Sequence, residues 1–440
     1  MKRRPQLAGG VALMSILLSS FPFEGQSVSS TGSSLQQPPD PSTVSAQVNF
    51  LVGQVAGSDT APPLPFSEAI RGLRLFPPGC IATTMHVDAA ALKGGDGSAN
   101  APFNTLRETF AAADENQACG LRALVARGKY AEGPLVVNRP SIVAGRASGV
   151  VVEGSFEVMS RTLVLASLTV VGDGQSLQPA VLAMFKSTVA VLNVNLIAPP
   201  RHGIRVHGGT LVVRRVDVSE AWTVPDDPSS GSAVHLTGGV NADLGLMRLS
   251  RSVRGLYAGD AGTRVRADSI TIEDTTIHPT RIANVAAGGC PALGFRYLGA
   301  VEIDSAAVLT GVEWVIQRTQ LASLYAHDDG YALLSQVAIN DTRQIVGECG
   351  GTGAVAHRGG AIELRFFAIT NSELCGVAVG GAPGSAIDLR RGLIDFAPVG
   401  ACVQQVGYDT SRLRNHVDYR TVGIPLQSTS YELPDYPPEF

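Results

Sequence analysis

A pattern of eight residues recurs along most of the chain. Each copy places four apolar residues in two alternating pairs, and two residues separate the pairs, as in residues 163–170. Alternation with a period of two is typical of β-strands, so each copy predicts two short strands that meet at a tight corner. Clear copies begin at Leu135, Leu163, Val189, Leu211, Val265, Leu309, Ala332 and Ile362, and weaker copies begin at Leu244 and Ile387.

The copies follow one another at a basic spacing of about 22 residues. A further short apolar stretch that ends in a glycine turn precedes several of them, at 203–209, 255–260, 354–360 and 376–381. Three strands and three corners make one coil of a parallel β-solenoid, whose coils stack at about 4.8 Å around one apolar core. The leucine-rich repeat has a similar period, but its Leu-x-x-Leu-x-Leu-x-x-Asn signature does not recur in this sequence.

The N-terminal residues predict export. A basic tripeptide at 2–4 precedes an apolar run over 7–23, and serine-rich polar sequence follows, which is the order of a secretory signal peptide. A single membrane anchor is the alternative, although the run is short for a membrane span. We predict a signal peptide over 1–30, a Ser/Pro-rich linker over 31–79, and a secreted, periplasmic or cell-surface protein without stable membrane insertion after signal cleavage.

A solenoid needs a cap at each end, because its terminal coils otherwise expose unpaired strand edges. We predict a short capping helix within 102–113, with Asn104 as its N-cap and its apolar residues on one face. The repeat fades after residue 405. We therefore predict a β-helix domain over 80–405 and a C-terminal cap or tail over 406–440.

The segment before the first copy resembles the N-terminal end of secreted right-handed parallel β-helix proteins, the pectate-lyase-like superfamily. The resemblance rests on Val87-Asp88, Gly94-Gly95-Asp96-Gly97-Ser98, Ala101-Pro102-Phe103-Asn104-Thr105-Leu106 and Gly128-Lys129-Tyr130-Ala131-Glu132. With the coils it covers about 85–405. It implies an all-β, right-handed parallel β-helix, here of roughly ten coils with a short N-terminal capping helix. The superfamily includes polysaccharide lyases, glycoside hydrolases and adhesins, so the resemblance is specific for fold and weak for function.

Composition and charge exclude other classes of protein. With 45% hydrophobic residues and 49 glycines, the chain can bury a large core between many tight turns, so neither disorder of the whole chain nor an all-helical fold is expected. The formal net charge is -4, and no basic run occurs beyond the N-terminus, so nucleic acid is not an expected partner.

The six cysteines permit three disulfides in an exported chain, and their spacing does not suggest a zinc site. Many connectivities remain open from sequence alone. Among them we favour the local pairs Cys80 with Cys119 and Cys375 with Cys402.

Aligned coils place equivalent residues in columns on the outside of the solenoid. Four successive coils carry an ionisable residue five positions before the start of the pattern, namely Asp260, Asp304, His327 and His357. Further ionisable residues follow directly in two of these coils, namely Asp328, Asp329 and Arg358. Neighbouring coils hold such groups about 5 Å apart, which suits carboxylates for glycoside cleavage or a Ca2+ ion held by several oxygens. The alternative is that Asp and Gly occur there only because they favour turns.

If this column is active, we expect each residue to have one of three roles. Asp328 or Asp329 supplies the acid, His357 or Arg358 supplies the base, and Asp260, Asp304 and Asp328 are the Ca2+ ligands. Asp328-Asp329 resembles the paired aspartates of polygalacturonases. The Gly-His-Gly and Arg-x-Lys elements of those enzymes are absent, so the catalytic signature is incomplete.

Three long insertions follow the second strand of a copy, near 221–232, 275–298 and 343–353, and we expect them to project from one corner. Loops on one edge of a solenoid commonly form its binding wall. We predict that ligand contacts there come from Trp222, His278, Arg296, Tyr297 and the neighbouring His327. The alternative is that an aromatic side chain packs only against its own loop.

These patterns predict an exported, monomeric β-helix protein that binds a polysaccharide or another cell-surface ligand through one edge of the solenoid. The alternative is a polysaccharide lyase or glycoside hydrolase that acts on uronate-containing polymers. The incomplete catalytic signature favours the binding protein.

Overall fold

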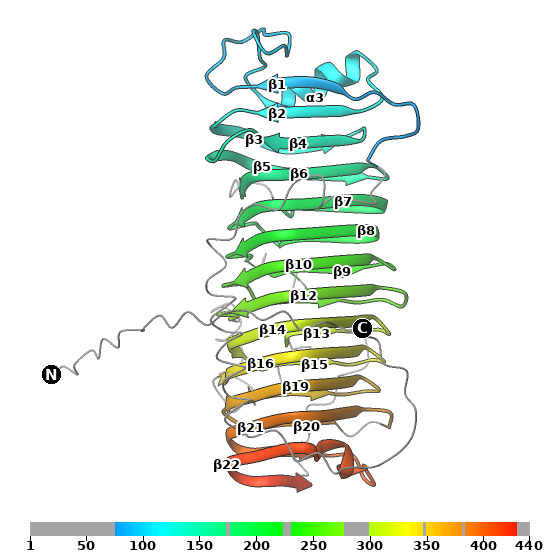
Figure 1. Ribbon diagram of the computed structural model, residues 1–440, viewed down its shortest axis with the longest axis vertical. Coiled ribbons are helices and arrows are strands. Elements are labelled where there is room, and N and C mark those ends of the chain that lie inside the picture. Colours follow the sequence, from blue (N-terminus) through cyan, green and yellow to red (C-terminus); the bar gives the residue numbers. More distant parts are fainter. Residues whose placement is uncertain are drawn as a thin grey trace, which may run out of the picture. The chain divides into compact units, whose positions relative to one another are not determined.

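The computed structural model describes residues 75–172, 177–222, 230–276, 299–345, 349–380 and 383–428. The predicted signal peptide and most of the predicted linker lie outside these residues. Within them, strands follow one another in a stack from β1 to β22, and all except β17 pair in parallel with strands of the neighbouring coil (Figure 1). One short antiparallel pair joins β16 to β17. The fold is a right-handed parallel β-helix, as predicted, with the handedness usual for crossovers between parallel strands.

The strand registers divide the coils into three parallel sheets. The first and second sheets come from the first and second halves of each copy, and the third sheet comes from the strand that precedes the copy. Strands of the first sheet alone are β1 (Thr83–Val87), β2 (Leu121–Val125) and β4 (Ser141–Gly145). Strands of the third sheet alone are β9 (Ser232–Thr237), β11 (Arg254–Ala258), β13 (Gly299–Ile303), β15 (Ala322–Ala326), β18 (Thr352–Ala356) and β20 (Cys375–Val379).

The remaining long strands bend around corners and serve more than one sheet. Those of the first and second sheets are β6 (Thr162–Val171), β10 (Asn241–Ser250), β12 (Arg264–Glu273), β14 (Val308–Gln320), β16 (Tyr331–Ile345) and β19 (Ala361–Ser372). Those of the second and third sheets are β3 (Gly128–Val137) and β5 (Val150–Met159), and those of all three sheets are β7 (Val181–Ile197), β8 (His202–Ser219), β21 (Ala386–Val403) and β22 (Asn415–Ser428). The short strand β17 is Cys349–Gly350.

The corner between the first and second sheets is the same in nine successive coils, from β6 to β21. Its second residue adopts the left-handed conformation, with φ from 52 to 61, in Ser167, Asn193, Arg215, Leu246, Ser269, Glu313, Gln336, Phe366 and Arg391. This conformation costs a non-glycine residue about 1–2 kcal/mol. Most of these residues have no local preference for it, so the stacking of the coils, with its ladders of hydrogen bonds and buried apolar side chains, imposes the corner.

The predicted apolar positions form the core, with two corrections. Leu163 and Leu165 are fully buried, as are their equivalents in later coils. The copy that begins at Leu135 spans β3 and β4 and therefore turns a different corner, from the third sheet to the first. The weak copy begins at Ala242 instead of Leu244, because Ala242 pairs with Leu211 of the preceding coil.

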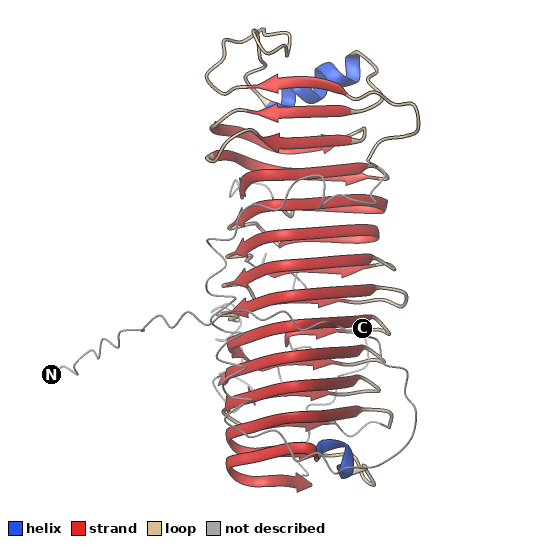
Figure 2. Cartoon of the chain, in the orientation of Figure 1, coloured by secondary structure: helices blue, strands red, loops and turns tan. Residues whose placement is uncertain are grey.

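A helix caps the N-terminal coils, as predicted (Figure 2). This helix, α3 (Leu106–Glu115), buries an apolar face, but its N-cap is Thr105 instead of Asn104. The Thr105 hydroxyl accepts the N–H of Glu108 at 3.1 Å. The carboxylate of Glu132 also accepts the N–H groups of Leu106 and Arg107, at 2.5 and 3.1 Å. A later strand thus completes the cap.

At the other end, the parallel ladder extends past residue 405, where we expected the repeat to stop. A short 3-10 helix, η3 (Thr410–Leu413), leads into β22, which pairs in parallel with β21. Val417 and Tyr419 take the place of the second half of a copy, because they pair with Gly392 and Ile394 of β21, and both pack against the core. The aromatic residue and the weaker apolar character hide this copy in the sequence.

Both favoured disulfides are present. Cys80 bonds to Cys119 near α3, and Cys375 bonds to Cys402 across β20 and β21. The side chains of Cys290 and Cys349 lie outside the described part of the structure. Among the described residues, no helix is long and apolar enough to cross a membrane.

Candidate functional site

The third sheet carries ionisable side chains on the face that points away from the core. At one register position, five neighbouring strands, β8, β9, β11, β13 and β15, present Arg205, His235, Tyr257, Glu302 and Tyr325. The residues on either side of this row belong to the apolar core or to the corner. Every residue of β13 and β15 is nevertheless buried, so this polar face is largely shielded from water.

Asp304, His327 and His357 lie in one column at the corner that follows these strands. Each donates its main-chain N–H to the last strand residue of the preceding coil, which fixes their register. The structure therefore brings together three of the four residues that the sequence pattern aligned.

Asp260, the fourth residue of the expected column, is displaced by one position. The turn after β11 has one residue more than the turns after β13 and β15, so Gly259 takes the place equivalent to Asp304. The exposed Asp260 carboxylate accepts the N–H of Gly238 at 2.8 Å. Asp260 thus has a turn-stabilising contact and does not belong to the group of converging ligand atoms at Asp304.

His327 lies at the centre of a buried ionic network. Its Nε2 faces Oε1 of Glu302 at 3.2 Å, while its Nδ1 faces Oδ2 of Asp328 at 2.8 Å and Oδ1 of Asp304 at 3.4 Å. His327, Glu302 and Asp304 are each at most 5% exposed. Asp328 reaches solvent with 32% of its side chain, and there its Oδ1 binds Nε of Arg358 at 2.8 Å. The network connects the interior to the surface through Asp328.

Tyr257 and Arg254 extend the network toward the preceding coil. The Tyr257 hydroxyl donates to Oδ2 of Asp304 at 3.0 Å, and Nη1 of Arg254 donates to Oε2 of Glu302 at 2.9 Å. The Arg254 guanidinium also lies 4.9 Å from the centroid of the Tyr257 ring, within cation–π range. We call the residues joined in this way the outer-face cluster: Arg254, Tyr257, Glu302, Asp304, His327 and Asp328.

Ring contacts continue the outer-face cluster in both directions along the sheet. Tyr325 stacks on His327 with ring centroids 4.5 Å apart. On the other side, His235 stacks on Tyr257 at 4.6 Å and contacts His202 at 4.5 Å. The polar face is thus a continuous array of side chains.

The network controls the protonation of its members. Burial by itself lowers the pKa of His327, but the hydrogen bond and charge of Glu302, with Asp304 and Asp328, outweigh burial and hold this pKa above its ordinary value. Burial raises the pKa of Glu302, but the Arg254 charge and the His327 contact outweigh it and hold this pKa below its ordinary value. Burial, together with Asp304 and Glu302, raises the pKa of Tyr257. The three carboxylates thus favour the protonated form of His327 more than water does.

Asp304, His327 and Asp328 have the arrangement of a small metal site, because one ligand atom from each lies within 4.8 Å of the others. A nitrogen ligand in the set fits zinc better than the predicted Ca2+, which prefers oxygen. The three carboxylates of the cluster already have partners in Arg254, His327 and Arg358. We therefore assign these residues to an ion-pair network.

The other residues predicted for the site are more widely spread. Asp329 follows Asp328 in the same left-handed turn. Trp222 lies at a different corner, between the second and third sheets, where its Nε1 donates to the carbonyl of Ala198 at 3.4 Å. His278, Arg296 and Tyr297 lie outside the described residues.

The sequence interpretation missed Arg254, Tyr257, Glu302 and Tyr325, which complete the site. Side chains alternate along a strand, so residues two positions apart share a face. Counting back two residues from Asp304 and His327 would have given Glu302 and Tyr325 as a second column on the same face, whereas Tyr257 lies three residues before the displaced Asp260. That signal was present in the sequence.

Comparisons with known proteins find related architectures. No family model and no curated protein matches the chain. Among solved structures, the catalytic unit of a GH87 alpha-1,3-glucanase from Streptomyces thermodiastaticus is similar over 82% of this chain and 71% of its own, with 13% identity and a TM-score of 0.36. Pectate lyase Pel9A is similar over 80% of this chain and 83% of its own, with 11% identity and a TM-score of 0.34. The A-module of the Azotobacter vinelandii mannuronan C-5 epimerase AlgE4 is similar over 79% of this chain and 98% of its own, with 11% identity and a TM-score of 0.33. At this level the similarity concerns architecture alone.

Proposed function

We propose that this protein binds a polysaccharide along the corner that follows the third sheet, together with the partly exposed residues of that sheet's outer face on earlier coils. The observation that supports this proposal is the anchoring of exposed polar groups by a buried network. Arg358, with 42% of its side chain exposed, binds Asp328, and the buried His327 holds Asp328 from beneath. Groups that are fixed before a ligand arrives lose little conformational freedom on binding.

The repeat of the coils suits a linear polymer. Coils stack at about 4.8 Å, so equivalent groups recur at a regular interval along the sheet, as sugar units recur along a polysaccharide. The partly exposed Arg205 and Tyr257 lie on the outer face of the third sheet, on earlier coils than the corner residues Asp328 and Arg358. Arg205 makes no side-chain ion pair within the described residues, so its guanidinium is available to a ligand.

The proposal predicts which variants lose binding. Replacing both Arg205→Gln and Arg358→Gln should weaken binding strongly, while the exposed Arg414→Gln, in the turn before β22, should leave it unchanged. The Arg358 pair is exposed, so its loss should cost at most about 1 kcal/mol of folding free energy. Isothermal titration calorimetry against polygalacturonate, alginate, xylan and an uncharged glucan measures the effect.

Two results would count against this proposal. If the parent protein binds none of these polymers, the proposed function is wrong. If the double variant binds as the parent does, the ligand lies on another face. Circular dichroism of each variant establishes that it is folded.

A second candidate function is cleavage of the bound polymer by a lyase or a hydrolase. It is favoured by the contact of 2.8 Å between Nδ1 of His327 and Oδ2 of the partly exposed Asp328, through which a protonated imidazole can pass a proton to Asp328 and so supply a general acid. Arg358 is not suited to the role of base, because it is ion-paired and a guanidinium stays protonated. His357 remains the candidate base.

The products distinguish the possible reactions. In a lyase, a base removes the proton beside the uronate carboxyl group, the C–H electron pair forms a double bond, and the glycosidic oxygen leaves with the proton of the acid. A hydrolase instead adds water across the bond between the glycosidic oxygen and the anomeric carbon, and it leaves no double bond. Ultraviolet-absorbing products identify a lyase, and new reducing ends without absorbance identify a hydrolase. If neither forms from a polymer that binds, the protein is a binding protein.

A further inference from the structure

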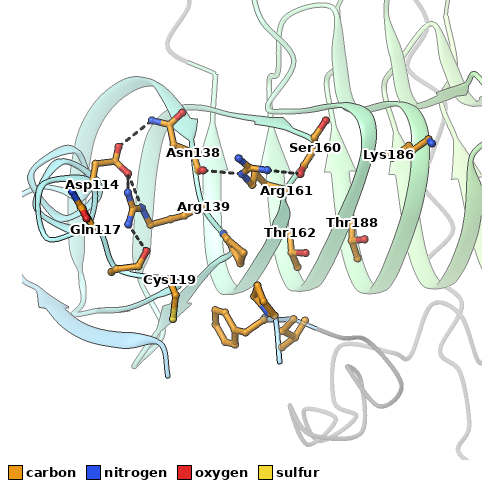
Figure 3. Close-up of a pocket in the computed structure, with 15 residues that line it drawn as sticks. Asp114, Gln117, Cys119, Asn138, Arg139, Ser160, Arg161, Thr162, Lys186 and Thr188 are labelled. Atoms are coloured by element: carbon orange, nitrogen blue, oxygen red, sulfur yellow. Dashed lines mark hydrogen bonds and ion pairs between the residues drawn. The ribbon is translucent and has the colours of Figure 1, made fainter. Parts of the chain in front are cut away.

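A cavity of about 650 Å³ lies on earlier coils of the same corner that carries the outer-face cluster. One wall consists of corner residues 138–140 and 160–162, together with Lys186 and Thr188 of β7. The end of α3 and residues 75–77 contribute the other walls (Figure 3). None of these residues belongs to the outer-face cluster.

The cavity wall carries more positive than negative charge. Arg139, Arg161 and Lys186 occur at this corner in three successive coils. Asp114 neutralises Arg139, whose Nε donates to Oδ1 of Asp114 at 2.6 Å. Arg161 and Lys186 are both exposed, and neither has a carboxylate partner among the described residues. In a chain with a formal net charge of -4, these two unpaired cations form a local site for an anion.

The remaining donors favour a tetrahedral oxyanion over a carboxylate. Arg161 donates from Nε to the carbonyl of Asn138 at 2.9 Å and from Nη1 to the carbonyl of Ser160 at 3.2 Å. The Nε–Nη2 fork therefore cannot hold a planar carboxylate by two parallel bonds, and one of the two Nη1 hydrogens of the other fork is already used. Its Nη2 makes no hydrogen bond within the described residues. The Lys186 ammonium can donate from any direction.

Two hydroxyl groups complete the set of donors. Thr162 and Thr188 pair with each other in neighbouring coils of the first sheet, and both side chains line the cavity. A sulfate or phosphate group has several oxygens, and it accepts single hydrogen bonds from separate directions, as these donors require.

The two ends of the cavity differ in charge. In Figure 3, Asp114 and Lys186 lie at opposite ends of the drawn residues. The last carbonyl groups of α3 add partial negative charge near Asp114. An anion should therefore lie at the end formed by Arg161 and Lys186.

We propose that Arg161, Lys186, Thr162 and Thr188 form a binding site for a sulfate or phosphate group. The group is either a free ion or an ester on a saccharide. This site is separate from the proposed polysaccharide face, and it is tested separately.

The experiment measures binding to the full chain by isothermal titration calorimetry at low salt. The ligands are inorganic sulfate, inorganic phosphate, a sulfated oligosaccharide, its unsulfated counterpart and an oligouronate. We expect the sulfated ligand to bind and the unsulfated one not to bind. Lys186→Gln should weaken binding about fivefold, since one charge contact in water is worth about 1 kcal/mol. Lys186→Glu should abolish it.

Lys186 is the better position for the test, because Arg161 also holds two main-chain carbonyls of its corner. The exposed Lys186 side chain makes no such contact within the described residues, so its variants should fold. Arg414→Gln is the matched control for loss of one exposed cation, and thermal melting of each variant monitors folding.

Each outcome decides a part of the proposal. One outcome is that the inorganic ions bind as tightly as the sulfated saccharide and that Lys186→Glu abolishes their binding. This result supports the site and identifies its ligand as the free ion. Binding that persists in Lys186→Glu overturns the site. An oligouronate that binds more tightly than any sulfated ligand overturns the choice of a tetrahedral group. If only Arg205→Gln with Arg358→Gln removes binding, this inference fails while the proposed function stands.

Discussion

Glu302 offers the strongest test of the outer-face cluster. It is 1% exposed, and its two carboxylate oxygens face different cations, Arg254 at 2.9 Å and His327 at 3.2 Å. Glu302→Gln keeps the shape of the side chain but removes the charge that both cations share. Removal of one partner from a buried ion pair costs about 3–5 kcal/mol, and we expect a loss of stability of this size.

The loss should depend on pH in a definite direction. The pKa of His327 in the folded protein is raised above its ordinary value of 6.5. Its protonation therefore contributes stability that is fully present below about pH 6.5 and is lost as the pH rises through the folded-state pKa. Glu302→Gln removes the main cause of the raised pKa. The variant should consequently lose more stability at about pH 6 than at about pH 9, by about 1.4 kcal/mol for each unit of pKa that is lost.

Urea-induced unfolding, followed by circular dichroism at the two pH values, measures the difference. Hydrogen exchange then shows whether the loss is confined to β11, β13 and β15, because coils of a solenoid can unfold locally. The matched control is Glu220→Gln, whose exposed partner Arg251 lies at 2.9 Å, and it should cost at most about 1 kcal/mol. A cost for Glu302→Gln no larger than the control, or one that is equal at both pH values, would refute the assigned network.

Two further predictions concern the core and a buried histidine. A Cβ atom on Gly311 would lie 2.0 Å from the carbonyl oxygen of Ala267 and 2.5 Å from Nε1 of the buried Trp314. Gly311→Ala should therefore lower the free energy of unfolding, measured by heat or urea, by at least about 1–3 kcal/mol. The control Gly245→Ala should lower it less, because the added Cβ atom meets only a flexible side chain. Burial, with the charges of nearby arginines, holds the pKa of His202 well below its ordinary value. The parent protein should therefore lose stability as the pH falls below about 6.5. His202→Gln should reduce this dependence of stability on pH, and an unchanged dependence would contradict the assignment.

The fold was predictable because its information repeats along the chain. A single copy such as residues 163–170 is weak evidence for two strands, but many copies at a regular spacing leave few architectures other than a solenoid. The same repetition made the left-handed corner predictable as a position, although residues such as Leu246 and Phe366 have no preference for that conformation. The ends were less predictable, because each cap is built once. The helix has Thr105 and not the predicted Asn104 as its N-cap, and its first turn is completed by Glu132, which lies on a later strand.

The outer-face cluster was only partly predictable, because its contacts depend on the alignment of coils that are far apart in sequence. Arg254 and Glu302 are separated by 48 residues, and Tyr257 and Asp304 by 47. Sequence spacing assigns such pairs only if each turn has the same length. The extra residue in the turn after β11 moved Asp260 out of its column, while Tyr257, which precedes that turn, kept its register. Columns counted within strands are thus reliable, and columns counted across a turn are not. Asp304, His327 and His357 precede turns of equal length, which explains why the sequence aligned them correctly and misplaced Asp260.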